Sequence, residues 1–266
     1  MKDGIQHGQG IAYWPDGRRY EGSFVKGERK GQGTFYCSDG RYVVGEFKKN
    51  KPNGIVTFYL ADGTIHYSGQ MKDGISHGQG VKYWQDGRRY EGNFVKGECK
   101  GQGTYYLSDG RYIVGEFKKN NVNGIATFFR ADGTIIYKGQ MKNGDYHGKG
   151  TYFWSDGRRW EGRFVNGETK GQISCYEPDG TLSFIGNFKN EEKSGFGTEY
   201  KPDGTKRYEG NFKEGEYNGK GTLYLDSGNR YEGEFRNGKI NGHGIEYDPN
   251  GNVLYDGKWK DGLRKE

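Results

Sequence analysis

Apolar and polar residues alternate along this chain in short segments that return with a period of about 24 residues, which indicates one supersecondary unit stacked on copies of itself. Each repeat contains an aromatic or large apolar residue, then one variable residue and then a glycine. Two places after the glycine comes Phe, Met or Trp, as in Tyr20-Glu21-Gly22-Ser23-Phe24. Such alternation is typical of a β-strand with one apolar face. The eleven repeat glycines are Gly22, Gly45, Gly69, Gly92, Gly115, Gly139, Gly162, Gly186, Gly210, Gly233 and Gly257.

Each repeat is predicted to be a β-hairpin, as residues 90–110 illustrate. Tyr90, Gly92 and Phe94 alternate on one face of a first strand, and Lys96-Gly97-Glu98 turns the chain. A second strand follows, and an Asp-Gly turn, a pair that tolerates positive φ, leads into the next repeat. We therefore expect an all-β, elongated solenoid of tandem antiparallel β-hairpins that form one long twisted sheet with a groove. At about 9.6 Å per repeat it would reach on the order of 100 Å.

The glycines within the strands predict a core of aromatic rings packed on glycine, because a missing side chain leaves room for a ring. One detail of the register leaves two alternatives open. Gly101 and Gly103 are in phase with Tyr105, whereas the aromatic residue found in every repeat comes one step later, at Tyr106. Either a bulge shifts the register or both faces of the sheet carry rings.

The repeats account for the whole sequence as one array. Residues 71–140 repeat residues 1–70 with 16 substitutions, and Met1 aligns on Met71, so the chain enters halfway through a repeat. The predicted boundaries are a partial first repeat at 1–19, ten repeats over 20–254 and a partial last repeat at 255–266, all within one array of 1–266. The first strand lacks a partner in such an array, so self-association through terminal edge strands is expected.

Composition supports an aromatic rather than an aliphatic core. The chain of 266 residues contains 50 Gly, 22 Tyr, 15 Phe and 5 Trp. It has no signal-like N-terminus and no apolar stretch long enough for a membrane-spanning helix. Cys37, Cys99 and Cys175 fall in different repeats, too far apart for disulfides, so free thiols in a reducing compartment are expected. These features predict a cytoplasmic protein, with peripheral membrane association as the alternative.

The order Tyr-Glu-Gly-x-Phe, then Gly-x-Gly-Thr, then Tyr and Asp-Gly closely resembles membrane occupation and recognition nexus (MORN) repeats, over the whole chain. The resemblance implies either an accessory array beside a catalytic domain or a whole protein that organises membranes, cytoskeleton or partner proteins. Because repeats account for every part of this sequence, we expect no catalytic domain. The departures from the pattern, which suggest local repacking, are Val43 and Ile113 for the leading aromatic, Val56, Ala126 and Ile173 for the second glycine, and Met71 and Met141 for the trailing aromatic.

Catalytic, metal and cofactor sites are not expected within the repeats. His7, His77 and His147 recur in the same context, but three repeats separate them by about 29 Å along a sheet, whereas zinc ligands converge on one ion. The Gly-x-Gly pairs lack the helix that a phosphate-binding loop needs. Paired carboxylates such as Glu209 and Glu232 are explained by cross-strand ion pairs.

Two features remain as candidate binding sites. A Trp-x-Asp-Gly-Arg-Arg module occurs three times, and pairs of lysines occur elsewhere in the repeats. The candidate partner-binding residues are Trp14, Arg18, Arg19, Trp84, Arg88, Arg89, Trp154, Arg158 and Arg159, and the candidate lipid-binding residues are Lys48, Lys49, Lys118 and Lys119.

The formal net charge of +6 is diluted by 35 acidic residues among 41 basic ones, so binding to nucleic acid is not favoured. Twist between strands would also turn successive modules away from a flat membrane. The sequence therefore favours a non-enzymatic scaffold or adaptor that binds a protein partner, as a helix or an extended peptide, along an aromatic-lined groove. Peripheral binding to acidic phospholipid membranes through the repeated basic turns is the alternative. The partner itself is not identified by the sequence.

Overall fold

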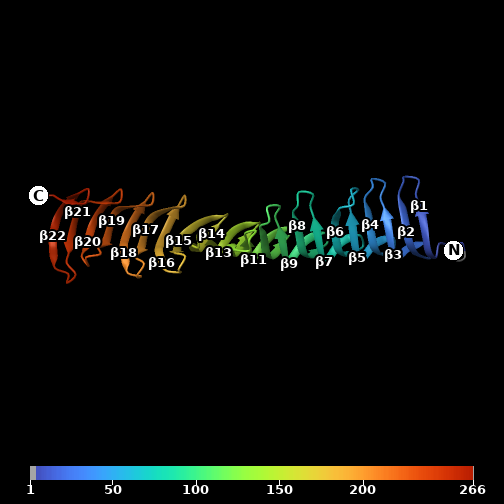
Figure 1. Cartoon of the computed structure of the whole chain (residues 1–266), viewed down its shortest axis with the longest axis horizontal. Helices are drawn as coiled ribbons and strands as arrows, with labels where there is room; N and C mark the ends of the chain where they lie inside the picture. The colour runs from blue at the N-terminus through green and yellow to red at the C-terminus, as the bar shows by residue number, and fades with distance from the viewer. Residues whose placement is uncertain (1–3, 266) are drawn as a thin grey trace. The chain divides into compact units, whose positions relative to one another are not determined.

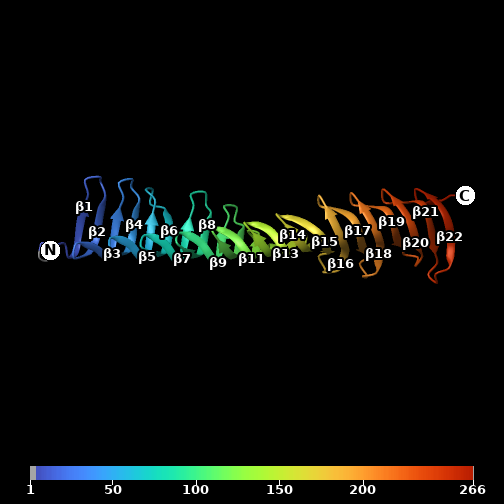
Figure 2. The same cartoon turned by 180° about the vertical axis from the view of Figure 1, so that it is seen from behind.

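The computed structural model describes residues 4–265, and every regular element in that range is a β-strand. Met1, which the repeat alignment places on Met71, lies outside the described residues. The chain divides into two compact units, one of residues 1–135 with 142–144 and the other of residues 136–141 with 145–266. Within each unit the strands follow one another side by side in chain order (Figures 1 and 2). The prediction of tandem antiparallel hairpins is confirmed within each unit.

The first unit contains β1 (Gly8–Tyr13), β2 (Arg19–Val25), β3 (Glu28–Tyr36), β4 (Tyr42–Lys48), β5 (Lys51–Tyr59), β6 (Ile65–Lys72), β7 (Ile75–Tyr83), β8 (Arg89–Val95), β9 (Glu98–Tyr106), β10 (Tyr112–Lys118) and β11 (Asn121–Phe129). Strand β12 (Ile135–Lys142) has its middle residues in the second unit. The second unit continues with β13 (Asp145–Phe153), β14 (Arg159–Val165), β15 (Glu168–Tyr176), β16 (Leu182–Lys189), β17 (Glu192–Tyr200), β18 (Lys206–Lys213), β19 (Glu216–Tyr224), β20 (Arg230–Arg236), β21 (Lys239–Tyr247), β22 (Val253–Lys260) and β23 (Leu263–Arg264). The expected association of the terminal strands stays a prediction.

Two kinds of turn alternate along the chain. Strands β8 and β9 are joined by Lys96 and Gly97, whose φ angles of 52° and 86° are both positive, as a two-residue hairpin turn requires. The Asp-Gly turns are longer, and in the turn before β8 the carboxylate of Asp86 accepts a hydrogen bond from the Arg88 backbone N–H at 3.1 Å. The tight turns therefore lie along one side of the sheet of each unit, at the ends of its strands, and the Asp-Gly turns lie along the opposite side. We call these two sides the tight-turn edge and the Asp-Gly edge.

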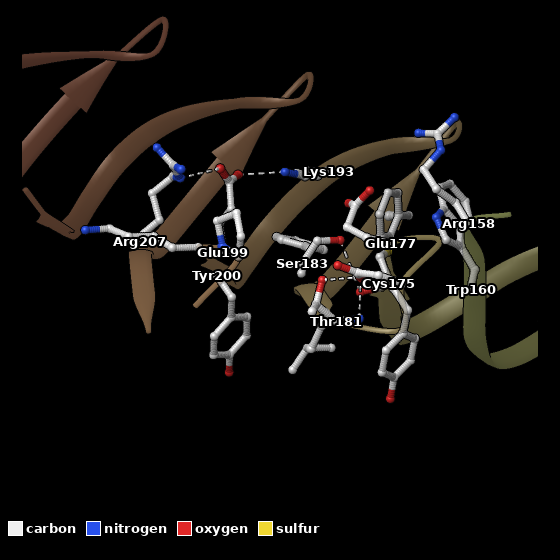
Figure 3. Close-up of a pocket in the computed structure, with 17 residues that line it drawn as sticks. Arg158, Trp160, Cys175, Glu177, Thr181, Ser183, Lys193, Glu199, Tyr200 and Arg207 are labelled. Atoms are coloured by element: carbon white, nitrogen blue, oxygen red, sulfur yellow. Dashed lines mark hydrogen bonds and ion pairs between the residues drawn. The ribbon is translucent and has the colours of Figure 1, made fainter. Parts of the chain in front are cut away.

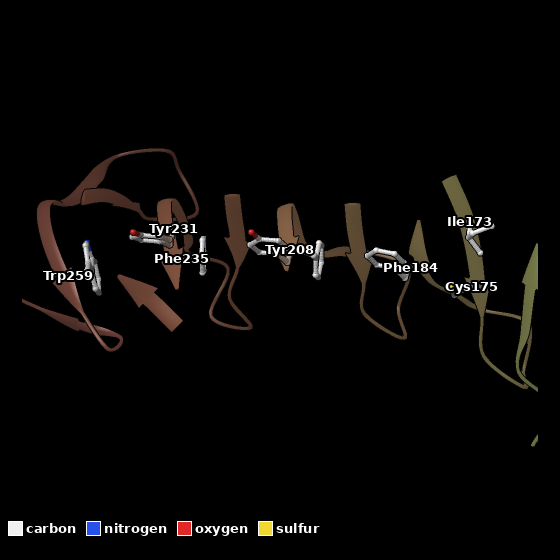
Figure 4. Packing of buried hydrophobic residues seen from close by; sticks show 8 residues of the cluster. Ile173, Cys175, Phe184, Tyr208, Tyr231, Phe235 and Trp259 are labelled. Atoms are coloured by element: carbon white, nitrogen blue, oxygen red, sulfur yellow. The ribbon is translucent and has the colours of Figure 1, made fainter. Parts of the chain in front are cut away.

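The core is made of rings that lie on paired glycines. Gly22 and Gly33 face each other on β2 and β3. A Cβ atom on Gly33 would collide with the Tyr20 ring, and the Tyr20 side chain is fully buried. We call this the core face; in the second unit its rings form a row through Phe184, Tyr208 and Tyr231 (Figure 4). The predicted packing of aromatic rings on glycine is confirmed.

A bulge explains why the ring at this position is usually tyrosine. On β2 and β3 the register shifts after Gly22, so Ser23 has no partner residue on β3. The Tyr20 hydroxyl donates a hydrogen bond to the Ser23 carbonyl at 3.2 Å. The same arrangement recurs, for example from Tyr208 to the carbonyl of Asn211 at 3.0 Å. The hydroxyl thus satisfies a backbone acceptor that the bulge has removed from the ladder.

Of the two alternatives left open by the register, the second is realised: both faces of the sheet carry rings. On the odd-numbered strand the bulge contains two extra residues, so it does not change which face the later residues occupy: Tyr105 pairs with Tyr90 on the core face. Tyr106 lies on the opposite face, which we call the second face, and its ring centroid is 5.7 Å from that of Tyr112. Tyr112 stacks in turn on Phe129 at 4.6 Å. Rings therefore line both faces.

The repeats have two lengths that differ by a single residue, and the difference has a structural cause at the Asp-Gly edge. In the longer repeats whose pairing is described, the even-numbered strand carries one unpaired residue beside the turn; these residues are His66, Ser183, Arg207 and Leu254. The shorter repeats have a regular register there, as between β7 and β8. The extra residue is therefore a one-residue bulge, a device that redirects a side chain.

Candidate functional site

The structure separates the residues of each Trp-x-Asp-Gly-Arg-Arg module. Trp14 lies on the core face against Phe35, with ring centroids 5.9 Å apart, and the Arg18 guanidinium is 5.8 Å from the Trp14 ring. Arg18 also forms an ion pair of 2.7 Å with Asp16 of its own turn. The other two modules repeat this arrangement through Trp84 with Arg88 and Trp154 with Arg158.

The second arginine of each module points to the opposite face. Arg19 lies over the Tyr36 ring at 4.1 Å, and Arg89 lies over Tyr106 at 3.8 Å. Arg159 lies over Tyr176 at 4.1 Å. The cause is the alternation of neighbouring strand residues between faces. One ligand lying on one face therefore cannot contact all three residues of a module.

The candidate lipid-binding lysines lie at the other edge of the sheet. Lys48 ends β4, and Lys49 takes part in the following tight turn with φ of 49°. Lys118 and Lys119 occupy the same places after β10. All four side chains are exposed. The candidate basic residues of the first unit are thus divided between two edges, and at one of them Asp16 and Asp86 pair with the first arginine of the turn, Arg18 and Arg88 respectively.

A hollow forms in the second unit because one repeat breaks the pairing of ring and glycine. Ile173 replaces the second glycine and is fully buried, and a Cβ on Gly162 would collide with its Cδ1 atom. Ile173 therefore fills the place that a ring occupies in other repeats. Trp160, which stands at the ring position, is displaced, remains half-buried and packs on Phe188 with centroids 4.6 Å apart.

Other substituted repeats avoid this conflict. Val43 and Val56 replace ring and glycine together, and both are buried. Ala126 likewise faces Gly115 in a repeat that has Ile113 at the ring position. The expected local repacking is confirmed at these sites, and Trp160 is the case in which a large ring is retained without its glycine.

Two adjoining hollows border Trp160 and Phe188 on the core face. The first, which we call the aromatic hollow, has a volume of about 690 Å³ and is lined by rings that include Tyr146, Trp154 and Phe164. The second, the charged hollow, has a volume of about 510 Å³ and lies between β14 and β18. Trp160 and Phe188 belong to both linings.

Two consecutive bulges place polar side chains in the charged hollow. Ser183 donates a hydrogen bond to the Cys175 carbonyl at 3.2 Å, and Arg207 turns toward Glu199. Figure 3 shows Lys193 and Arg207 approaching Glu199 from two sides, while Tyr200 points the other way. The sequence marks this site by the spacing of its repeat glycines. The intervals from Gly162 to Gly186 and from Gly186 to Gly210 are both of the longer kind, and nowhere else in the sequence do two longer intervals follow each other.

Glu199 is the centre of the polar network. Its Oε2 atom lies 2.7 Å from Lys193 Nζ, and its Oε1 atom lies 3.7 Å from Arg207 Nε. The Tyr217 hydroxyl donates to the same Oε1 atom at 3.3 Å. Burial, together with the negative charge of Glu199, raises the pKa of Tyr217, so the hydroxyl stays protonated and available as a donor.

Lys193 also links the charges to the rings, because its Nζ atom is 4.7 Å from the centroid of Phe184. Sequence reasoning proposed Trp154 and Arg158 as binding residues, and they line the aromatic and the charged hollow respectively. It missed Trp160, which the repeat pattern places in the core, and it missed Lys193, Glu199 and Arg207, which lie outside the repeated motifs.

The cysteines lie in different repeats, and the potential metal ligands among the described residues are not clustered. Cys37, Cys99 and Cys175 are free, as expected. Burial raises the pKa of Cys99 to about 11 and that of Cys175 to about 12, which keeps both thiols protonated at neutral pH. Within residues 4–265 no three His, Cys, Asp or Glu side chains are grouped to hold a metal ion. The same range contains no helix long and apolar enough to cross a membrane.

The fold and its repeated ring-on-glycine core define a β-hairpin repeat protein. The MORN repeat model matches ten segments that together cover more than half of the chain: residues 1–18, 20–40, 44–65, 67–88, 90–110, 137–158, 184–206, 208–230, 231–253 and 255–265. The chain belongs to the MORN repeat family. The repeat that holds Gly162 and Ile173 lies largely outside these segments, in agreement with its altered packing.

No curated protein matches the chain. Among solved structures, the wild-type TCP10 domain of Danio rerio CPAP is similar at 14% identity, with 94% of this chain and 99% of that chain covered and a TM-score of 0.23. The TCP domain of Drosophila melanogaster SAS-4 (dCPAP), solved in complex with a proline-rich motif of Ana2 (dSTIL), is similar at 10% identity, with coverage of 92% and 86% and a TM-score of 0.21. Likenesses this distant do not bear on what this chain binds.

Proposed function

We propose that the chain is a non-enzymatic scaffold or adaptor that binds a protein partner, as a helix or an extended peptide, on the core face of its second unit. One observation carries the proposal: Ile173 displaces Trp160 from its glycine pair and leaves it half-exposed between two hollows. Large rings beside a pocket are the residues that contribute most to protein interfaces, because they remove much apolar surface from water.

Support also comes from the composition of the two hollows. Rings from several strands line the aromatic hollow, and charged side chains lie beside them in the charged hollow. An apolar centre with polar groups around it resembles the anatomy of a protein interface. MORN repeat arrays are generally non-catalytic, which agrees with a binding role.

The experiment closes the hollow without removing the fold. The double variant Trp160→Tyr with Ile173→Gly restores the tyrosine and glycine of other repeats, so its ring is expected to lie on Gly162 as Tyr208 lies on Gly210. Partners would be recovered by cross-linking and mass spectrometry, and their affinities measured by calorimetry. We expect the variant to bind the partner at least about 30-fold more weakly, the change that a loss of about 2 kcal/mol produces.

The matched control is Val43→Tyr with Val56→Gly, which makes the same exchange in a repeat whose packing is already complete. The control should bind like the wild type. Equal affinity of the wild type and the Trp160→Tyr, Ile173→Gly variant would contradict the proposal.

Binding to acidic phospholipid is the competing outcome. It would be detected by flotation with anionic liposomes at two salt concentrations, since attraction to headgroups weakens as salt rises. In that case replacing Lys48, Lys49, Lys118 and Lys119 should abolish flotation. The division of basic residues between two edges leads us to expect little flotation of the wild type.

A further inference from the structure

We infer that the aromatic hollow binds an arginine side chain of the protein partner. The inference rests on the proposed function and names the side chain that the partner places beside Trp160. Its basis is a comparison within the chain: the equivalent place in the first unit is filled by Arg29 of the chain itself, whereas Thr169 stands there in the second unit.

Arg29 and Thr169 hold the same position in related repeats. Residues 141–171 repeat residues 1–31, as residues 71–101 also do, and the position is occupied by Arg29, Cys99 and Thr169 in the three copies. Strand pairing agrees with this alignment, because each of the three faces a phenylalanine across the tight turn. The pairs are Phe24 with Arg29, Phe94 with Cys99 and Phe164 with Thr169. The surroundings of Arg29 therefore show what a side chain at this position can reach.

The Arg29 guanidinium lies in a cage of rings. The distances from its Cζ atom to the ring centroids are 4.6 Å for Phe35, 5.5 Å for Trp14, 5.6 Å for Tyr20 and 5.9 Å for Phe47. Its Nη2 atom also donates a hydrogen bond to the Asn50 carbonyl at 2.6 Å. Aromatic faces attract a cation through the negative charge density of their π electrons, and a planar guanidinium also stacks on them. The first unit thus contains a cation site built from the repeat.

The aromatic hollow has a similar cage without this cation. Three of its lining rings stand at positions equivalent to rings around Arg29: Trp154 for Trp14, Trp160 for Tyr20 and Phe188 for Phe47. Tyr152 adds a ring 5.1 Å from that of Trp154, with the two planes 73° apart. Thr169 also lines the hollow, but its side chain is short and uncharged. A volume of about 690 Å³ is left open, which is within the usual range of ligand pockets.

The second copy supplies a cation from another strand. Lys82 Nζ lies 5.2 Å from the centroid of the Trp84 ring. In the third copy the residue equivalent to Lys82 is Tyr152, which carries no positive charge. The turn arginines do not distinguish the copies, since Arg18, Arg88 and Arg158 each lie 5.8 Å from the tryptophan of their own module. Two copies therefore add a strand cation beside their tryptophan, and the third leaves that place to a ligand.

Charge in the lining of the aromatic hollow favours a cationic ligand. Glu168 and Glu191 are negative and Lys189 is positive, so two negative charges stand against one positive charge. All three side chains are exposed, and they act by attracting a cation toward the hollow. Glu191 also stands at the position of Asn50, with a φ angle of 63° against 67°. Its carbonyl is therefore placed to accept a hydrogen bond from an arginine, as the Asn50 carbonyl does from Arg29.

The adjoining charged hollow does not oppose a cation. Its lining contains four cations, Arg158, Lys193, Lys201 and Arg207, and three carboxylates, Glu177, Asp179 and Glu199. Two more carboxylates pair with these cations from outside the lining: Asp156 is 2.7 Å from Arg158, and Asp226 is 2.8 Å from Lys201. The three lining carboxylates and these two together outnumber the four cations, so the charged hollow carries no excess positive charge.

The test uses four capped tripeptides, acetyl-Gly-Xaa-Gly-amide, in which Xaa is arginine, citrulline, lysine or trimethyllysine. Citrulline has the shape of arginine without its charge. Binding to the full chain is followed by NMR of the ¹⁵N-labelled tryptophan indoles. We expect the arginine probe to shift the signals of Trp154 and Trp160 and to bind at least about fivefold more tightly than the citrulline probe, the change that about 1 kcal/mol of cation–π attraction produces. The lysine probe should bind more weakly than the arginine probe, because it has no planar group to stack.

The first unit provides an internal control. The Trp14 signal should not respond to the arginine probe, because Arg29 already lies beside that ring. In the variant Arg29→Thr, which gives the first unit the residue found in the third copy, the Trp14 signal should respond.

The reciprocal variant closes the hollow. Thr169→Arg should place its own guanidinium among the rings and weaken binding of the arginine probe at least about tenfold. Thr151→Arg is the matched control, since it adds the same charge to the second unit on the second face, where Thr151 pairs with Glu161. It should bind the probe like the wild type.

The outcomes separate the inference from the proposed function. Equal binding of the arginine and citrulline probes, or no binding of either, would overturn the inference. Tightest binding of the trimethyllysine probe would also overturn it and assign the hollow to a quaternary ammonium group, as in a choline headgroup. A recovered partner that is weakened by Trp160→Tyr with Ile173→Gly but not by Thr169→Arg would overturn the inference and leave the proposed function standing. A partner unaffected by either variant would contradict both.

Discussion

At the residue scale, the contact between a tyrosine ring and two glycines is the smallest unit of the core packing in this chain. A ring on a glycine pair buries apolar area that the scarce aliphatic residues cannot supply, and its hydroxyl satisfies the carbonyl of the bulged residue, as Tyr20 does for Ser23. The packing of rings on glycines could be predicted from the sequence, because the spacing of Tyr and Gly is visible. The acceptor of the hydroxyl could not, because the bulge is a property of the pairing between strands.

A glycine beneath a ring should not tolerate even one methyl group. A Cβ on Gly221 would collide with the Tyr208 side chain, so Gly221→Ala should lower the free energy of unfolding by about 1 to 3 kcal/mol through overpacking. The larger change Gly210→Val should cost at least as much, since a Cβ there would lie 2.5 Å from the Gly221 Cα atom. Chemical denaturation measures both.

Gly10→Ala is the control for this prediction. Gly10 holds the same place in its repeat as Gly221, but a Cβ there would meet the Phe24 ring at 3.7 Å, an ordinary van der Waals contact. We expect its free energy of unfolding to stay within about 0.5 kcal/mol of the wild type. If Gly10→Ala and Gly221→Ala were equally destabilising, the ring-on-glycine account would be wrong.

At the scale of the element, the hairpin determines on which face of the sheet each side chain of a motif lies. The sequence presents Trp154, Arg158 and Arg159 as one module, and the strand separates them: Trp154 and Arg158 are on the core face and Arg159 is over Tyr176 on the second face. The turns and strands were predictable from the Gly and Asp-Gly spacing. The face of each arginine depends on where the strand begins after the turn, which the motif alone does not state.

This separation predicts unequal effects of neighbouring substitutions. Replacing Trp154 and Arg158 with alanine should weaken partner binding by about 2 kcal/mol, because both side chains line the hollows. Arg159→Ala should change it by less than about 0.5 kcal/mol. Calorimetry with a recovered partner compares the two variants. A larger loss from Arg159→Ala would move the interface to the second face.

At the scale of the whole molecule, buried tyrosines make stability depend on pH in the alkaline range. Burial raises the pKa of Tyr67, Tyr137 and Tyr208 to about 12 each, against about 10 in an unfolded chain. Below about pH 10 these hydroxyls are protonated in both states, so their contribution is complete. Between about pH 10 and about pH 12 the unfolded state loses protons that the folded state retains, so stability falls.

Both units contain such tyrosines, so we expect the melting temperature to fall steeply between about pH 10 and about pH 12. Circular dichroism follows unfolding, and tyrosinate absorbance follows ionisation. Tyr208→Phe is the control, because Phe184 already occupies the same place in another repeat. Its melting temperature should fall less steeply over this range even though it starts lower after losing the hydrogen bond to Asn211. A flat profile for the wild type would contradict the expectation.

The displacement of Trp160 by Ile173 has a consequence for how arrays of this kind diversify. A paired replacement, as at Val43 and Val56, keeps the core packed, whereas Ile173 alone at the second glycine displaces Trp160 and leaves hollows beside it. Since the repeats share one plan, we expect the same single exchange in another repeat that keeps its large ring to open a similar hollow there. Under the proposed function, a binding position could therefore be added, removed or moved one repeat at a time.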